Sequence, residues 1–170
     1  FYGLASAKLI FENLSRACEN GDDLEAREAM ALASYYGGLA ISQALVGYVH
    51  AISHNLGARY GVPHGLGNAM VLPHVLELLK QDAAPRMAEI ALHAGLGDST
   101  ESESALAQKL VDRVWELNRK IGIPETTDLI KADDIEELVD AALAEGSAYP
   151  TPRFFERHEC RGILERLSAT

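Results

Sequence analysis

Apolar residues recur along most of this chain at intervals of three or four positions, which is the spacing of one face of an α-helix. The clearest stripe consists of Leu106, Leu110, Val114, Leu117 and Ile121. No segment alternates strictly between apolar and polar residues, so few or no strands are expected. Helices are predicted over residues 3–19, 24–44, 48–60, 70–79, 85–94, 105–121 and 133–145, with a last one through Ile163 and Leu164. The pattern predicts an all-α protein, a multi-helix bundle.

The predicted helix at residues 24–44 differs from the others because it is apolar on nearly every side. Asp22 and Asp23 precede it and supply an N-cap and negative charge at its first turn. Many of its side chains are small, which gives the helix a small diameter; these residues are Ala29, Ala31, Ala33, Gly37, Gly38 and Ala40. We expect such a helix to be buried centrally, with its small residues allowing neighbouring helices to approach closely.

Length and composition place the chain among ordinary globular domains. Its 170 residues are about the size of one domain, so a single helical domain over residues 1–170 is predicted. The net charge of −10 excludes the basic surface that nucleic-acid binding requires. No apolar run approaches the roughly 18 residues of a membrane span. Cys18 and Cys160 lack a CxxC neighbour, so both are expected to be free thiols in a reducing cytoplasm.

Three of the six histidines lie close together in the sequence, at His50, His54 and His64. His50 and His54 are four residues apart, so their rings share one face of the predicted helix at 48–60. His64 follows a Gly-Val-Pro that ends this helix and turns the chain back. Neutral imidazoles converging on one point are typical metal donors. The pattern alone leaves a second interpretation open, in which the rings only donate hydrogen bonds to carbonyl groups.

The same stretch resembles a known protein family. The run Gly47-Tyr-Val-His-Ala-Ile-Ser-His-Asn-Leu-Gly57, the run Pro63-His-Gly-x-x-Asn-Ala69 and the run Leu72-Pro-His74 look like the signature of the iron-containing (group III) alcohol dehydrogenases. The run from Ala31 to Ala40 and the closing Tyr149-Pro-Thr-Pro-Arg153 are similar to that family as well. Together these matches cover most of the chain.

The resemblance implies a fold and a set of site residues. Members of the family have an N-terminal nucleotide-binding domain and an all-helical C-terminal domain of the dehydroquinate synthase-like fold, with metal and substrate in the cleft between them. An Asp and a His on one helix hold the metal together with two further histidines, which carry over onto His50 and His64. His54 matches the family histidine implicated in substrate binding and proton transfer. Apart from the resemblance, Asn55 and Arg59 follow His54 on the predicted helix and either line the cleft or have a solvated or packing role.

The sequence departs from the family pattern in two respects. It contains no Asp-x-x-x-His and no Gly-Gly-Gly-Ser phosphate-binding stretch. It also begins at Phe1, without a helix cap, inside an apolar helical pattern. The expectation is that the N-terminal nucleotide-binding domain is missing. Half of the metal ligands would be missing with it, so this polypeptide alone is predicted to be catalytically inert.

The activity implied by the resemblance is the interconversion of a small alcohol and its aldehyde by hydride transfer to NAD or NADP. A divalent metal, Fe²⁺ first and Zn²⁺ second, would polarise the substrate oxygen. Residues that bind the nicotinamide cofactor remain unassigned, and assembly into a homo-oligomer stays open. Two alternatives are kept: a non-catalytic helical binding or oligomerisation module, and a metal-free member resembling maleylacetate reductase. His74 is expected to be structural rather than a ligand.

Overall fold

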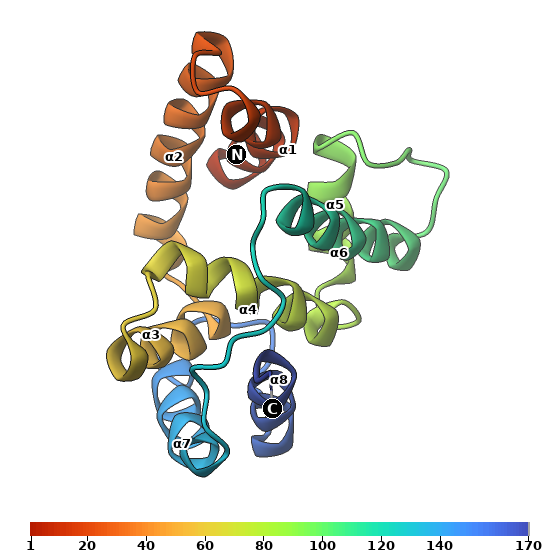
Figure 1. Cartoon of the computed structure of the whole chain (residues 1–170). Helices are drawn as coiled ribbons and strands as arrows, with labels where there is room; N and C mark the ends of the chain where they lie inside the picture. Colours follow the sequence, from red (N-terminus) through yellow and green to blue (C-terminus); the bar gives the residue numbers. More distant parts are fainter. Residues whose placement is uncertain (170) are drawn as a thin grey trace. The chain divides into compact units, whose positions relative to one another are not determined.

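The computed structural model describes residues 1–169, and these form an array of helices without a named strand (Figure 1). The helices are α1 (Tyr2–Glu19), α2 (Leu24–Ala44), α3 (Tyr48–Tyr60), α4 (His64–Leu79), α5 (Ala84–His93), α6 (Glu103–Lys120), α7 (Ile135–Gly146) and α8 (Arg157–Leu167). A short 3-10 turn, η1 (Ala132–Asp134), precedes α7. The only β-type pairing within residues 1–169 is an isolated bridge between Thr127 and Ser168. The all-α prediction is confirmed.

Local sequence signals set the helix boundaries. The side chain of Asp23 accepts a hydrogen bond of 3.0 Å from the Ala26 amide and so caps α2 at its N-terminus, as predicted. Gly61 ends α3 in the left-handed conformation, with φ of 70°, which a glycine adopts without steric cost. The bounds of α2 and α3 agree with the predicted ranges. Helix α4 begins earlier than predicted, at His64.

The contacts within the chain divide it into two compact units. The first, called here unit 1, consists of Phe1–Leu45 and Lys80–Ile121 and contains α1, α2, α5 and α6. Unit 2 consists of Val46–Leu79 and Gly122–Thr170 and contains α3, α4, η1, α7 and α8. The single domain expected from the chain length stays a prediction.

In unit 1, helix α2 packs along α1 through small residues, as expected. The Ser6 hydroxyl donates a hydrogen bond of 2.9 Å to the Ala33 carbonyl across this contact. The expectation that α2 is centrally buried is wrong. Only Ala26 and Ala33 of this helix are buried, while Tyr35 is 63% exposed. Only some of its small residues are covered: Ala33 is buried, whereas Ala31 and Gly38 are exposed. Its larger apolar side chains Leu32 and Ile41 are exposed as well.

In unit 2, the core is built from large aliphatic side chains of every helix. The buried members include Ile52, Leu56, Val71, Val75, Val139, Ile163, Leu164 and Leu167. The ring of Tyr48 stacks on Phe155 at 4.2 Å between centroids, and its hydroxyl accepts a hydrogen bond of 3.1 Å from the Phe155 amide. This packing fixes α3 against α4 and α7, the helices that carry the candidate site.

Both cysteines are free thiols, as predicted: Cys18 is exposed and Cys160 is buried. Burial raises the pKa of the Cys160 thiol to about 11, with a smaller contribution from the neighbouring Glu159. No single helix of the described residues is long and apolar enough to cross a membrane. Helices α2 and α3 meet that criterion, by length and composition only, when they are taken together as a bent pair.

Candidate functional site

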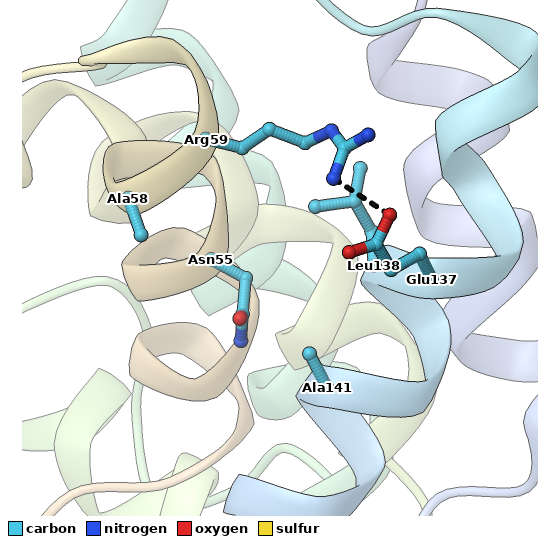
Figure 2. A pocket seen from close by; sticks show the side chains of 6 residues that line it. All are labelled: Asn55, Ala58, Arg59, Glu137, Leu138 and Ala141. Carbon is cyan, nitrogen blue, oxygen red and sulfur yellow. Dashed lines mark hydrogen bonds and ion pairs between the residues drawn. The ribbon is translucent and has the colours of Figure 1, made fainter.

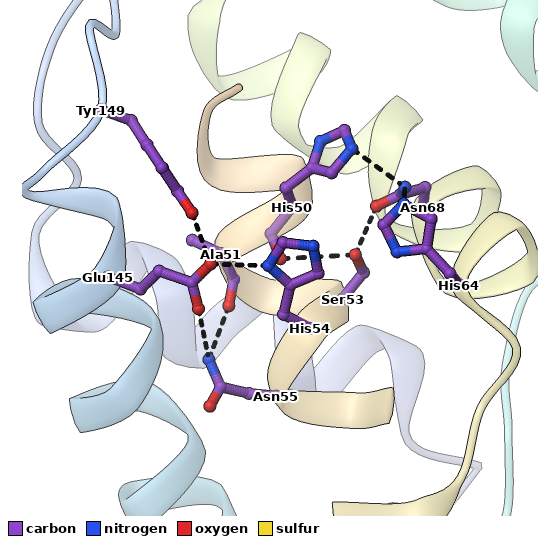
Figure 3. Close-up of polar contacts among 9 residues, drawn as sticks. All are labelled: His50, Ala51, Ser53, His54, Asn55, His64, Asn68, Glu145 and Tyr149. Carbon is purple, nitrogen blue, oxygen red and sulfur yellow. Dashed lines mark hydrogen bonds and ion pairs between the residues drawn. The ribbon is translucent and has the colours of Figure 1, made fainter. Parts of the chain in front are cut away.

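The three histidines of the sequence motif meet in unit 2, where α3 carries His50 and His54 and α4 opens with His64 (Figure 3). The ring centroids of His50 and His54 are 5.4 Å apart, and the His64 ring lies 5.2 Å from each of the other two. The left-handed cap at Gly61 ends α3, and α4 starts three residues later. The helical spacing and the turn thus predicted the convergence of these rings.

Two of the rings direct a nitrogen at the same atom. The Nδ2 of Asn68 lies 3.3 Å from His50 Nε2 and 3.0 Å from His64 Nε2 (Figure 3). Because an amide nitrogen only donates hydrogen bonds, both imidazole nitrogens face it with their lone pairs. The side-chain oxygen of Asn68 accepts a hydrogen bond from the Ser53 hydroxyl. This contact orients the amide so that its nitrogen faces the two imidazoles.

The surroundings of His50 favour its neutral form. Burial lowers the pKa of His50, and the nearby His64 and His54 lower it further, while Glu145 acts weakly in the opposite direction. A neutral imidazole is the form that binds a metal. The environment of His50 is therefore suited to a ligand.

These residues fit part of a metal site. The lone pairs of His50 and His64 converge on one point, where a cation would replace the two hydrogen bonds from Asn68. A protein metal site commonly uses three or four protein ligands. Among residues 1–169, no group of three or more His, Cys, Asp or Glu side chains is arranged to hold an ion. Residues 1–169 thus offer two converging imidazole donors. That the remaining ligands belong to another domain stays a prediction.

His54 is engaged by a carboxylate that the sequence analysis missed. Its Nδ1 lies 2.7 Å from Glu145 Oε1, and the hydroxyl of Tyr149 donates to the same oxygen at 2.7 Å (Figure 3). The amide of Asn55 lies 3.4 Å from the other carboxylate oxygen. Glu145 stands 91 residues from His54 along the chain, so no helical periodicity connects them. The only available signal was that Tyr149 belongs to one of the family-like runs.

A pocket of about 250 Å³ lies beside this network, between α3 and α7 (Figure 2). Its lining consists of Asn55, Ala58, Arg59, Glu137, Leu138 and Ala141. The Arg59 guanidinium donates to Glu137 at 2.7 Å and also pairs with Asp134. The hydrogen bond from Arg59 lowers the pKa of Asp134. Asn55 and Arg59 therefore line a pocket, and the charge of Arg59 is matched by two carboxylates.

His74 lies away from the three-ring cluster and is 8% exposed. Burial lowers its pKa to about 4, and the charge of Arg166 lowers it further. The Nε of Arg166 donates to His74 Nδ1 at 3.4 Å. A buried neutral imidazole between helices is a packing element, in agreement with the structural role predicted for it.

Comparison with known proteins connects this geometry to a family. The family described as "Fe-containing alcohol dehydrogenase family, C-terminal" matches residues 2–168. The chain belongs to this family. It is similar to alcohol dehydrogenase 4 of Schizosaccharomyces pombe, with 39% identity over 162 residues, and to 1,3-propanediol dehydrogenase of Klebsiella pneumoniae, with 36% identity over 165 residues. These alignments cover 93% and 96% of the chain.

Solved structures of iron-containing alcohol dehydrogenases share the fold. A crystal structure of a 1,3-propanediol oxidoreductase superposes with a TM-score of 0.91 at 36% identity over 96% of this chain. The matched region is 44% of that structure, and it is 37% and 43% of the two enzymes named above. The chain thus spans about two fifths of the length of the relatives it matches.

Proposed function

We propose that this chain is the helical, metal-binding part of an NAD(P)-linked alcohol dehydrogenase that interconverts a small alcohol and its aldehyde. The observation that carries the proposal is the convergence of His50 Nε2 and His64 Nε2 on one point, occupied by the Asn68 amide. The family and the names of its relatives, which include an NAD-dependent methanol dehydrogenase, support the reaction class.

Each site residue has a distinct role in this proposal. His50 and His64 hold a divalent metal, Fe²⁺ or Zn²⁺, together with ligands from a nucleotide-binding domain. When bound, the metal supplies electrophilic polarisation of the alcohol oxygen. His54 stands beside both ligands and takes up the proton that the alcohol hydroxyl releases. The nicotinamide cofactor carries the redox step and is bound by the other domain.

We do not expect the described residues to catalyse the reaction alone, because further metal ligands and a bound nicotinamide are needed. Two imidazoles alone bind a metal weakly, and no hydride acceptor is positioned by this helical part. We therefore expect the 170-residue chain, supplied with Fe²⁺ or Zn²⁺ and NAD or NADP, to show no alcohol-dependent cofactor reduction. Robust turnover by this chain alone would contradict that expectation.

The proposal is tested with a chimera. The part of Klebsiella 1,3-propanediol dehydrogenase that precedes the region matched here is joined to this chain, and the product is checked for folding by circular dichroism. With Fe²⁺ added, the chimera should reduce NAD in the presence of short alcohols and contain one metal ion per chain. A folded chimera that binds metal but oxidises no alcohol in a broad panel would overturn the proposal.

Histidine variants of the chimera separate the proposal from its alternatives. His50→Ala and His64→Ala should each remove the metal and lower kcat by more than the roughly 10–100-fold typical of residues that only support a ligand. The matched control is His93→Ala, because His93 is exposed on α5 and its ring contacts the Glu89 carbonyl of its own helix. Metal content unchanged in both ligand variants would favour a metal-free enzyme or a non-catalytic module.

A further inference from the structure

Glu145 lies in the last turn of α7 and receives polar contacts from three side chains (Figure 3). Its Oε1 is 2.7 Å from His54 Nδ1 and 2.7 Å from the Tyr149 hydroxyl, while its Oε2 is 3.4 Å from Asn55 Nδ2. Asn55 also donates to the Ala51 carbonyl at 2.7 Å, so its amide is fixed by its own helix. The carboxylate is thereby held in one orientation against the edge of the His54 ring.

These contacts determine which nitrogen of His54 carries a proton. An ionised carboxylate accepts hydrogen bonds and donates none, so the ring nitrogen facing it must be an N–H. Nδ1 is therefore the protonated nitrogen, and in the neutral ring the lone pair resides on Nε2. Figure 3 shows this second nitrogen on the side of the ring where His50 and Asn68 lie.

We propose that Glu145 is a positioning residue that holds His54 as the Nδ1–H tautomer and directs its Nε2 lone pair toward the His50–His64 site. The tautomer follows from the contacts of Glu145 alone. Its consequence for catalysis rests on the proposed function, in which His54 Nε2 accepts the proton of the alcohol hydroxyl. That proton then lies on Nε2, while Nδ1–H keeps its hydrogen bond to the carboxylate.

The alternative is an ordinary surface ion pair. The His54 and Glu145 side chains are 41% and 28% exposed, and an exposed pair contributes little and leaves both side chains free to rotate. Two observations distinguish this contact. Tyr149 and Asn55 anchor the carboxylate independently of His54, and the ring of His54 is further confined by the neighbouring rings of His50 and His64.

The tautomer is measured directly in the 170-residue chain by long-range ¹H–¹⁵N correlation spectra of the histidine rings. The spectra are recorded without metal and at alkaline pH, where imidazoles are neutral. The His54 signals are assigned with His54→Gln. We expect His54 to be mainly the Nδ1–H tautomer in the native chain and in Glu145→Asp. In Glu145→Ala the Nε2–H tautomer, which a free imidazole prefers in water, should predominate.

The matched control is Glu137→Gln. Glu137 lies on the same helix, also pairs with a residue of α3 and loses the same charge, but it contacts Arg59 rather than His54. Its spectrum should keep the native tautomer. If native His54 is mainly Nε2–H, or if Glu145→Ala leaves the tautomer unchanged, the inference is wrong. Should the alanine variant not fold, Glu145→Gln takes its place. Its amide can donate to Nδ1, so the Nε2–H tautomer should increase relative to the native spectrum, and an unchanged tautomer would overturn the inference.

A kinetic readout in the chimera tests the catalytic consequence. Glu145→Gln should lower kcat about 10–100-fold with KM and metal content unchanged, because Glu145 acts through His54 and touches neither substrate nor metal. Glu145→Asp should restore most of the loss. A parallel rise in KM, or loss of metal, would show a merely structural role and overturn the inference. Because the spectra require neither metal nor turnover, an inactive chimera would count against the proposed function without changing the tautomer result.

Discussion

The two compact units of this chain differ in how they bury apolar surface. Of the twelve largest fully buried side chains among residues 1–169, eleven belong to unit 2, and only Val111 belongs to unit 1. The exposed large apolar side chains are distributed in the opposite way, with seven in unit 1 and two, Leu129 and Phe154, in unit 2. Unit 2 is therefore the densely packed region, and it is the one that carries His50, His54 and His64.

This difference in packing explains which unit can hold catalytic or metal-binding side chains in a fixed position. A catalytic or metal-binding group must be fixed by packing and hydrogen bonds, which requires rigid elements around it. In unit 2, the side chains of Ile52 and Leu56 on α3 are buried in the core, which holds the helix and its histidine side chains in place. In unit 1, α1 and α2 meet through small side chains and one buried hydroxyl, which leaves little to orient a site.

The largest expected effect comes from comparing two truncations, one at a buried residue of unit 2 and one at an exposed apolar residue of unit 1. Ile52→Ala should lower the free energy of unfolding by about 2–5 kcal/mol, because Ile52 is 1% exposed and its loss leaves a cavity. Leu32→Ala on α2 should change it by less than about 0.5 kcal/mol, since Leu32 is 43% exposed. Urea unfolding followed by circular dichroism measures both. An equal loss of unfolding free energy in the two variants would contradict the difference in packing between the units.

The second prediction concerns pH and the buried His74 of unit 2. Its pKa is about 4 in the folded chain, against an ordinary value of 6.5. Between these values the unfolded chain binds the additional proton, so the free energy of unfolding falls as the pH is lowered from 6.5 toward 4. The His74 contribution has a slope of at most about 1.4 kcal/mol per pH unit.

Urea titrations at several pH values across this range measure that slope. The variant His74→Gln should lose a large part of it. His93→Gln, on an exposed histidine of unit 1, should keep the native slope. A native slope in His74→Gln would show that burial of this ring does not govern the acid sensitivity.

A third, smaller effect is expected from adding one methyl group in each unit. At Gly146 of α7, a Cβ atom would collide with the Tyr48 ring, which is itself stacked on Phe155. Gly146→Ala should therefore cost about 1–3 kcal/mol through overpacking. Gly38 of α2 has no atom within 4 Å of its Cβ position, so Gly38→Ala should stabilise the chain by about 0.4–1 kcal/mol. Thermal unfolding of the two variants gives the sign of each change.

The smallest effect tests the polar contact of unit 1. Ser6→Ala removes the hydroxyl that donates to Ala33 and should lower the free energy of unfolding by about 0.5–1.5 kcal/mol. Ser42 is the control, because its hydroxyl is exposed and donates only to Leu39 of its own helix. Ser42→Ala should be within about 0.5 kcal/mol of the native chain. A loss in Ser6→Ala as large as that of Ile52→Ala would show that unit 1 depends on this bond more than its packing suggests.

The helices themselves were predictable because their signals are local. The start of α2 follows from Asp23 and the end of α3 from Gly61, residues whose capping preferences act within one turn. The convergence of the three imidazoles followed from the four-residue spacing of His50 and His54 and from the turn before His64. The burial of α2 was predicted wrongly, because composition shows that a helix is apolar but not how much of it other elements cover.

Glu145 shows the limit of sequence reasoning most clearly. The residue was predicted as the end of a helix, and nothing nearby indicated a contact with His54, because the packing of α7 on α3 joins positions 91 residues apart. Asn68 was visible within a family-like run, yet its place between two imidazole nitrogens depended on how α4 crosses α3.

The sequence by itself determined the helical class, the bounds of α2 and α3, and the family, since these depend on short-range patterns and on the spacing of the histidines. Only the tertiary structure decided which nitrogens face one another, which carboxylate engages His54 and how little of α2 is buried. Such relations arise when side chains distant in the chain pack in three dimensions, and contact between them depends on shape complementarity rather than on local preference.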